Sequence, residues 1–272
     1  MDRKKLANII IEQLKINEYH IRQLAEQSIN KIGYFYIDNV LPEDYARKLF
    51  NVFPKTKDMI LRKNIREYKY IGVQMNKYNS LLEESIYAFQ DERIVSFIAN
   101  IFNLNKVYPD PNLYASGISI MKKNNFLNPH IDNSHDKDRN KWRVLNLLYY
   151  VTPGWNEDYG GNFEIWNNGV NNNQIMIHSK FNRLVVMVTH NSAWHSVSPV
   201  KYNGNRCCIS NYYFSNFSAN NNTDFHVTSF RARPGQKIKD IILRFDASMR
   251  MAIRNFFKMG ITKEFHVYKD EE

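Results

Sequence analysis

The 272-residue sequence has only two cysteines, and they are adjacent, at Cys207 and Cys208. Neighbouring thiols are poorly placed to bond to each other, and they give neither a disulfide framework nor the C-x-x-C spacing of a zinc site. We therefore expect a protein of a reducing compartment, the cytoplasm. The N-terminal stretch has no small-residue cleavage site after its short apolar run, which favours a helix over a secretory signal.

Long hydrophobic runs are also missing, and no apolar stretch approaches the roughly 18–20 residues that span a bilayer. We therefore expect no membrane partner. The formal net charge of +10 favours anionic partners, but the basic residues are scattered and form no dense block. A small-molecule or peptide substrate, acidic if the charge is informative, is preferred over nucleic acid. Repeats and clear linkers are absent, so a single elaborated domain over 1–272 is the simpler interpretation, and no feature predicts the oligomeric state.

Hydrophobic residues make up 43% of the chain and aromatic residues 14%, enough for a substantial core. Residues 1–110 are predicted to form a mainly helical N-terminal support with one strand. Apolar residues recur at helical spacing over 3–29, 42–53, 81–90 and 92–102, and a strand-like run covers 33–41.

Residues 111–216 have a different character, with eight short β-rich runs divided by turn residues. These runs are LYASGISIM, FLNPHID, RVLNLLYYV, GNFEIW, QIMIHS, RLVVMV, AWHSVSPV and RCCISNYYF. Asn168-Gly169 between the fourth and fifth runs predicts a hairpin. The fold class is therefore α+β with a mainly β core: a double-stranded β-helix (jelly roll, cupin-like) with flanking N-terminal and C-terminal helices.

Residues 217–272 are predicted to be a C-terminal extension with one helix over 236–259. Its apolar residues, which include Ile238, Ile241, Phe245 and Met249, recur at helical spacing. We expect this helix to pack on the sandwich.

The run PHID places His130 and Asp132 two residues apart, so on an extended strand both side chains point the same way. A facial triad for non-haem iron needs two histidines and one carboxylate. His195 is the preferred third ligand because Arg206 follows it across the turn VKYNGN, which would return the next strand beside it. A metal and an arginine so placed could hold the two ends of a small dicarboxylate.

The segments PHID, RVLNLLYYVTPGW, YGGNFEIW, AWHSVSPV and NRCCISNYYF, in this order, resemble the iron(II)/2-oxoglutarate-dependent oxygenases of the prolyl-4-hydroxylase-like branch. The lead-in GYFYIDNVLPEDYARKL is similar to that branch too. The resemblance covers about residues 113–214. It implies the jelly-roll fold, with Fe(II), 2-oxoglutarate and O2 as cofactors and ascorbate as an optional reductant.

Carried over by position, the resemblance assigns each candidate residue a role. His130, Asp132 and His195 become the iron ligands; Arg206, Tyr150, Leu148 and Ser210 contact 2-oxoglutarate; Asn146, Tyr212 and Met121 face the substrate or support the ligands. Strand alternation independently places Asn146, Leu148 and Tyr150 on one face, and Ser210 and Tyr212 on the face of Arg206. Met121 departs from the pattern, because Met121 and Ile120 stand where many relatives have a tyrosine.

The function implied is hydroxylation of an unactivated C–H bond, with release of succinate and CO2. Asp132 favours hydroxylation, because halogenating relatives replace this carboxylate by a small residue. The substrate class stays open between a small molecule, a glycan- or nucleotide-linked intermediate and a peptidyl residue, and the loops 133–142, 153–159 and 217–226 are expected to select it. Two alternatives remain: a non-catalytic jelly-roll binding module, and a metal-dependent hydrolase that uses the same ligands.

Overall fold

A computed structural model describes residues 1–257. The α-helices are α1 (Arg3–Ile16), α2 (Glu18–Ser28), α3 (Glu43–Asn51), α4 (Ser80–Phe89), α5 (Glu92–Ile101) and α6 (Lys237–Phe257). Short 3-10 turns occupy Thr56–Asp58, Met75–Lys77 and Glu157–Tyr159. The strands are β1 (Tyr34–Asp38), β2 (Ile60–Lys63), β3 (Glu67–Gly72), β4 (Val107–Tyr108), β5 (Gly117–Met121), β6 (Phe126–Ile131), β7 (Trp142–Tyr150), β8 (Phe163–Ile165), β9 (Ile175–Ile177), β10 (Arg183–Val188), β11 (His195–Val197), β12 (Arg206–Ser215) and β13 (Ser229–Phe230).

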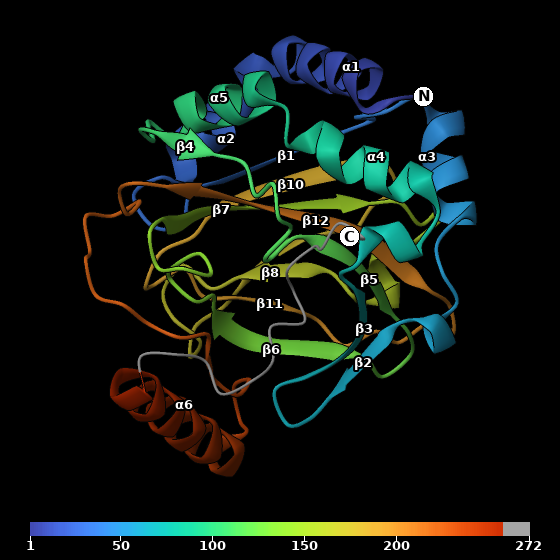
Figure 1. Cartoon of the computed structure of the whole chain (residues 1–272). Helices are drawn as coiled ribbons and strands as arrows, with labels where there is room; N and C mark the ends of the chain where they lie inside the picture. The colour runs from blue at the N-terminus through green and yellow to red at the C-terminus, as the bar shows by residue number, and fades with distance from the viewer. Residues whose placement is uncertain (258–272) are drawn as a thin grey trace.

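The strands form one antiparallel sheet in the order β1-β10-β7-β12-β5-β3-β6-β11-β8-β9, which rolls over on itself. One layer is built on β10, β7, β12 and β5, and the other on β6, β11 and β8 (Figure 1). All eight strands predicted between 113 and 214 are present, and the predicted jelly roll is confirmed. The predicted hairpin joins β8 to β9, although its loop is longer than a two-residue turn.

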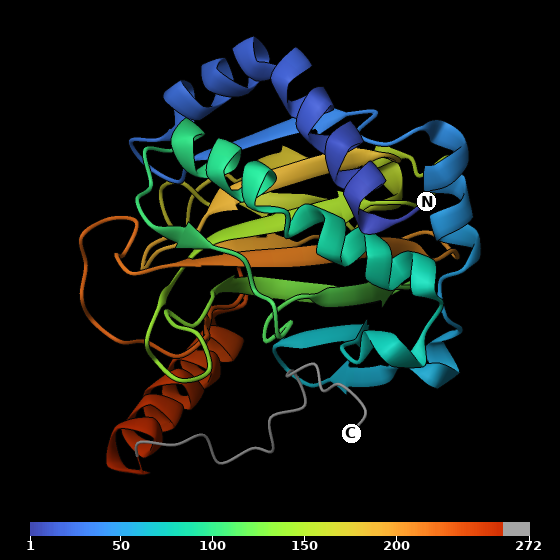
Figure 2. The same ribbon diagram turned by 45° about the horizontal axis from the view of Figure 1, so that its top comes forward.

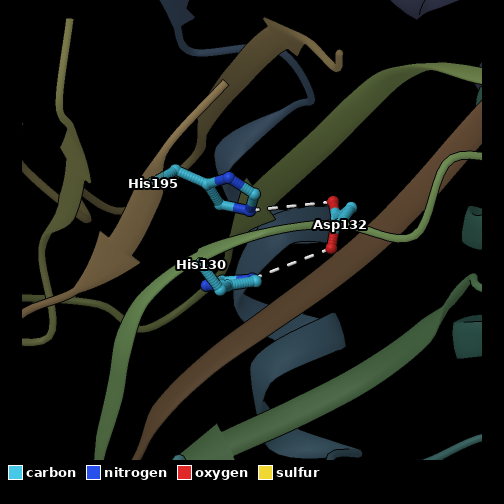
Figure 3. A group of neighbouring side chains, drawn as sticks. All are labelled: His130, Asp132 and His195. Atoms are coloured by element: carbon cyan, nitrogen blue, oxygen red, sulfur yellow. Dashed lines mark ion pairs between the residues drawn. The ribbon is translucent and has the colours of Figure 1, made fainter. Parts of the chain in front are cut away.

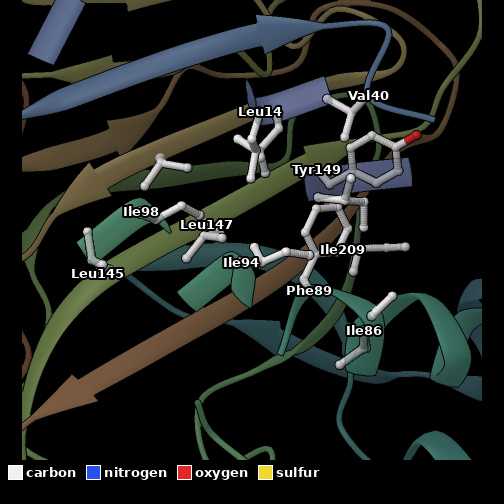
Figure 4. Packing of buried hydrophobic residues seen from close by; sticks show 14 of the residues in the cluster. Leu14, Val40, Ile86, Phe89, Ile94, Ile98, Leu145, Leu147, Tyr149 and Ile209 are labelled. Carbon is white, nitrogen blue, oxygen red and sulfur yellow. The ribbon is translucent and has the colours of Figure 1, made fainter. Parts of the chain in front are cut away.

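Helices α1, α2, α4 and α5 cover the outer face of the first layer (Figures 1 and 2). The main core lies between them and alternate residues of β7 and β12, including Leu145, Leu147, Tyr149 and Ile209 (Figure 4). The opposite residues of β7 and β12 face the inside of the roll, where Tyr150 and Cys208 share a second apolar cluster with Phe163 and Ile165. This alternation divides each strand into a helix-packing side and an interior side.

The N-terminal support differs from its prediction in two respects. The helix predicted over 3–29 is two helices, because the chain turns at Asn17, whose side chain donates to the carbonyl of Gln13 at 2.8 Å. The prediction of a single strand was also wrong, since β2 and β3 form a hairpin and β4 pairs with β12. Charged residues obscure alternation in the hairpin, and pairing of β3 with both β5 and β6 stabilises it.

Helix α6 also differs from its prediction. It begins within one residue of its expected start, and its predicted end at residue 259 lies outside the described residues. The helix packs on the sandwich as expected, through Leu243, which is buried against Phe230 and Ala232. Its apolar stripe does not take part in this contact, since Ile241 and Phe245 remain 68% and 70% exposed. Polar contacts hold the other side of the helix instead, among them an ion pair between Arg231 and Asp240 at 2.7 Å. Within 1–257 no helix combines the length and apolar character needed to traverse a bilayer.

Candidate metal centre

Strands β6 and β11 bring His130, Asp132 and His195 together inside the roll. His130 and His195 are directly paired in the ladder between these strands, and Asp132 follows the end of β6. One potential ligand atom from each residue lies within 4.8 Å of the others, and all three side chains are buried. Both imidazoles point toward the carboxylate, with Nε2 of each 3.7 Å from an oxygen of Asp132 (Figure 3).

The outer nitrogen of each imidazole contacts a backbone carbonyl. Nδ1 of His130 lies 3.0 Å from the carbonyl oxygen of Asn128, and Nδ1 of His195 lies 3.0 Å from that of Ala193. A carbonyl only accepts hydrogen bonds, so each Nδ1 must carry the proton. The lone pair of each Nε2 is then left facing Asp132, as a metal ligand requires.

Burial and charge favour the protonation states that bind a cation. Burial, with the nearby His195, lowers the pKa of His130 to about 3, so its imidazole is neutral. Burial alone would raise the pKa of Asp132, but His195 and Arg143 hold it below its usual value. Within residues 1–257, Oδ2 of Asp132 has no hydrogen-bond partner although it is buried. A buried ionised carboxylate with an unpaired oxygen, facing two free imidazole nitrogens, fits a divalent transition metal.

Arg206 and Tyr150 lie together on the interior side of β12 and β7. The guanidinium carbon of Arg206 is 4.7 Å from the centre of the Tyr150 ring, and its Nε donates to Oγ of Ser179 at 3.3 Å. The Tyr150 hydroxyl is buried and, in the described part of the chain, has no hydrogen-bond partner. Burial raises the pKa of Tyr150 to about 12, so this hydroxyl remains a donor. The buried guanidinium of Arg206, beside an O–H donor that has no partner in the described chain, is suited to bind a carboxylate.

The other predicted residues share this interior side. In the ladder between β7 and β12, Ser210 pairs with Leu148 and Tyr212 with Asn146. The Ser210 hydroxyl donates to the carbonyl of Gly117 at 3.2 Å, so that proton is already used. Met121 lies opposite Arg206 in the ladder with β5 and packs in a cluster with Trp155, Val197 and Val200.

Two residues at the centre were not predicted. Nη1 of Arg143 lies 3.6 Å from Oδ1 of Asp132, and its guanidinium stacks over Tyr212 at 4.5 Å. Strict alternation would place Arg143 with Leu145 on the helix-packing side. The register shifts between Tyr213 and Phe214, so β7 gains one residue at this point and the arginine turns inward. A single sequence carries no clear signal for the position of such a bulge.

Phe230 is the second unexpected residue, and it comes from the C-terminal extension. Its ring stacks on His130 with centroids 5.0 Å apart and an interplanar angle of 16°. Strand β13 pairs Phe230 with His130 at the edge of β6. No short-range signal in the sequence links residue 230 to residue 130.

Two of the three expected specificity loops border the centre. A hollow beside Asp132 is lined by Asn133, Ser134 and Trp142 from the first loop, and from the last loop by Ser218, Ala219, Asn220, Asn222 and His226. The remaining loop, 153–159, instead lines a separate surface hollow with Tyr36 and Lys180. The wall next to the metal centre is therefore rich in amide and hydroxyl groups.

Comparison with known proteins gives a family for the core of the chain. Residues 116–214 match the model of the 2OG-Fe(II) oxygenase superfamily. No match was found among curated proteins.

Solved structures show the same fold at low identity. A prolyl-4-hydroxylase from Pseudomonas putida is 14% identical with a TM-score of 0.53, over 72% of this chain and 98% of that one. A prolyl 4-hydroxylase from Phytophthora capsici is 15% identical with a TM-score of 0.50, over 93% and 77%. The α-ketoglutarate-dependent epimerase SnoN of nogalamycin biosynthesis is 10% identical with a TM-score of 0.50, over 82% and 89%.

At these identities the structural likeness speaks for the fold alone, and the family assignment comes from the matched segment and its buried His-Asp-His cluster. That segment runs from β5 to β12 and contains every predicted site residue. Residues 116–214 therefore match the 2OG-Fe(II) oxygenase superfamily, and the buried His-Asp-His cluster within them supports a dioxygenase that uses Fe(II), 2-oxoglutarate and O2.

Proposed function

We propose that this protein is a hydroxylase in which His130, Asp132 and His195 bind the iron. The observation that carries the proposal is the convergence of the three buried ligand groups within 4.8 Å. Two imidazoles and one carboxylate leave other coordination positions open. Bound there, Fe(II) and 2-oxoglutarate would supply the oxidising power to hydroxylate an unactivated C–H bond, with succinate and CO2 as products.

In this proposal Arg206 and Tyr150 hold the far carboxylate of 2-oxoglutarate. The arginine offers a planar pair of N–H donors, and the tyrosine adds the O–H group that has no partner within residues 1–257. Leu148, which packs against the interior cluster, forms the apolar wall. Ser210 lies on the same side, but since its hydroxyl donates to Gly117, it supports the wall and donates nothing further.

The substrate would approach through the hollow beside Asp132. Asn146, Tyr212 and Arg143 lie on the interior side there, and Oδ1 of Asn146 is buried with no partner in the described chain. An arginine and several amides suit a substrate that carries hydroxyl, amide or anionic groups. Met121 lies in an apolar cluster and would act only through packing on Arg206.

Anaerobic titration with Fe(II) and 2-oxoglutarate tests the iron site. We expect a weak visible charge-transfer band in the wild type and in the His20→Ala control, because His20 is exposed and belongs to α2, which covers the outer face of the sheet. The band should be lost in His130→Ala. A correctly folded wild type without the band would contradict the proposal.

Substrate-stimulated succinate release tests the reaction itself. Succinate should form only with 2-oxoglutarate and O2, and a panel of small molecules, glycosides, nucleotide-linked compounds and peptides should contain one class that stimulates it. Hydrolysis that needs the metal but neither co-reactant would favour a metal-dependent hydrolase. A band without turnover on any class would favour the non-catalytic binding module.

A further inference from the structure

Helix α6 turns a continuous apolar stripe toward solvent. The exposed fractions are 78% for Ile238, 68% for Ile241, 49% for Ile242, 70% for Phe245 and 47% for Met249. Their spacing of i, i+3, i+4, i+7 and i+11 places all five on one face of the helix. Leu243 is buried and packs with Phe230 and Ala232. The helix therefore uses a small contact for docking and leaves its larger apolar face open to solvent within residues 1–257.

Ion pairs fix this orientation. Arg231 binds both carboxylate oxygens of Asp240, which also accepts the backbone N–H of Ala232 at 2.9 Å. Further along the helix, Arg66 lies 3.6 Å from Asp246. The helix lies on the side of the molecule opposite α1, α4 and α5 (Figures 1 and 2). Since the polar side of α6 binds the protein body, rotation to bury the stripe would break these pairs.

The charge around the stripe is positive. Helix α6 contains five basic and two acidic residues. The two acidic residues, Asp240 and Asp246, are both paired with arginines. Lys237 and Arg244 are exposed next to the stripe. An apolar face flanked by lysine and arginine is typical of helices that lie in the interface of an anionic membrane.

Charge also distinguishes between two binding partners for the apolar stripe, a second copy of this chain and a lipid surface. A second copy of this chain would bring basic flanks together, in a protein whose formal net charge is already +10. An anionic lipid surface satisfies both the apolar stripe and the basic flanks. The sequence-based expectation of no membrane partner rested on the missing spanning segment, and a helix that lies in the interface needs none.

We propose that α6 docks the protein on an anionic phospholipid surface, with Ile238, Ile241 and Phe245 among the acyl chains and Lys237 and Arg244 at the phosphates. The proposal does not depend on the chemistry of the metal centre. It assigns α6 a peripheral and reversible role, because one short stripe gives only moderate affinity.

Vesicle co-sedimentation of the full chain is the test. The wild type should bind vesicles of phosphatidylcholine mixed with phosphatidylglycerol and bind pure phosphatidylcholine far less. Ile241→Gln/Phe245→Gln should lower the partition coefficient by at least about tenfold, because two large apolar groups no longer leave water. Glutamine keeps a good helix propensity, so α6 should stay folded.

Two further variants make the test specific. The matched control Ile16→Gln/Tyr19→Gln removes apolar groups of similar exposure, 67% and 83%, from α1 and α2, and should bind as the wild type does. Lys237→Gln/Arg244→Gln should lose most of the preference for anionic vesicles and most of the salt dependence.

Several outcomes would overturn the proposal. They are no binding of the wild type to anionic vesicles, an equal loss of binding in the α1–α2 control, or binding that ignores lipid charge. A dimer in sedimentation equilibrium that Ile241→Gln/Phe245→Gln dissociates, without vesicle binding, would identify the stripe as an interface between copies.

Discussion

Replacing Gly161 by alanine tests whether the backbone beside Arg206 sets the position of its guanidinium. Gly161 has a φ of +70°, and a Cβ built there would lie 3.0 Å from Cδ of Arg206 and 3.1 Å from Cγ2 of Val200. Both contacts are closer than ordinary carbon–carbon packing. Val200 is buried in a packed cluster, so the arginine side chain, which has more rotatable bonds, is the group that moves. Its 3.3 Å hydrogen bond to Ser179 should then be lost.

The expected magnitudes follow from two separate effects. An L-residue in the left-handed region costs roughly 1–2 kcal/mol of folding free energy. A misplaced guanidinium also loses a charge-assisted bond to the cosubstrate, worth about 1.5–3 kcal/mol. The second effect corresponds to a dissociation constant for 2-oxoglutarate raised about 10- to 150-fold.

Gly169→Ala is the matched control. Gly169 has a similar φ of +80°, and apart from its two chain neighbours no residue of the described chain has an atom within 4 Å of a Cβ built there. Both variants should therefore lose similar stability in urea unfolding. Only Gly161→Ala should bind 2-oxoglutarate more weakly.

Anaerobic titration of the iron-loaded protein with 2-oxoglutarate, followed by the visible band, measures the affinity. Fe(II) affinity should be nearly unchanged in both variants, because the change acts on the far carboxylate. Equal 2-oxoglutarate affinity in Gly161→Ala and Gly169→Ala would refute the reasoning, and so would a loss confined to iron binding.

Three further predictions concern the support of the site. Arg233→Gln removes a bidentate partner of the buried Glu164 and should lower the free energy of unfolding, measured in urea, by about 3–5 kcal/mol. Adding Glu164→Gln should recover part of this loss, because the buried carboxylate is then no longer left without its partner. Equal free energies of unfolding for the single and the double variant would contradict this reasoning. Burial raises the pKa of Cys207 to about 12 and that of Cys208 to about 11. Both thiols should therefore stay protonated and unreactive toward a disulfide reagent at pH 8, and they should react once the protein is unfolded. Fast reaction of the folded protein with the reagent would contradict this prediction. Phe230→Ala should cost about 3–5 kcal/mol in stability and weaken Fe(II) binding, measured by calorimetry, whereas Phe217→Ala, an exposed control, should do neither.

Much of the metal centre could be predicted because it depends on strand periodicity. His130 and Asp132 share a face by alternation. The prediction that the turn before Arg206 returns its strand beside the strand of His195 was wrong, because β12 pairs with β7 and β5 in one layer whereas β11 pairs with β6 and β8 in the other. Arg143 was not predicted because one inserted residue in β7 reverses the alternation of side chains. Bulges form where two strands meet in space, and the sequence of one strand does not specify that register.

The remaining differences have the same origin in tertiary contacts. The apolar period of α6 predicts a helix correctly but cannot say which side docks, and here the ion pair of Asp240 decides it. The hairpin of β2 and β3 depends on partners that lie about fifty residues downstream. The extent of the domain, the cytoplasmic location and the roles of the individual site residues stay predictions.

The position of β3 between β5 and β6 has a consequence for the order of folding. During synthesis the hairpin of β2 and β3 leaves the ribosome well before β5 and β6, so the backbone groups of β3 that pair with these two strands stay unpaired until residues 118–127 follow. The two halves of the roll are then joined by a strand from outside the catalytic segment. A fragment that starts at residue 111 would have open edges on β5 and β6, and we expect it to aggregate instead of folding. Residues 116–214 can therefore be matched to the superfamily by sequence alone, but the two layers of the roll are joined at this point by β3, which belongs to the N-terminal third of the chain.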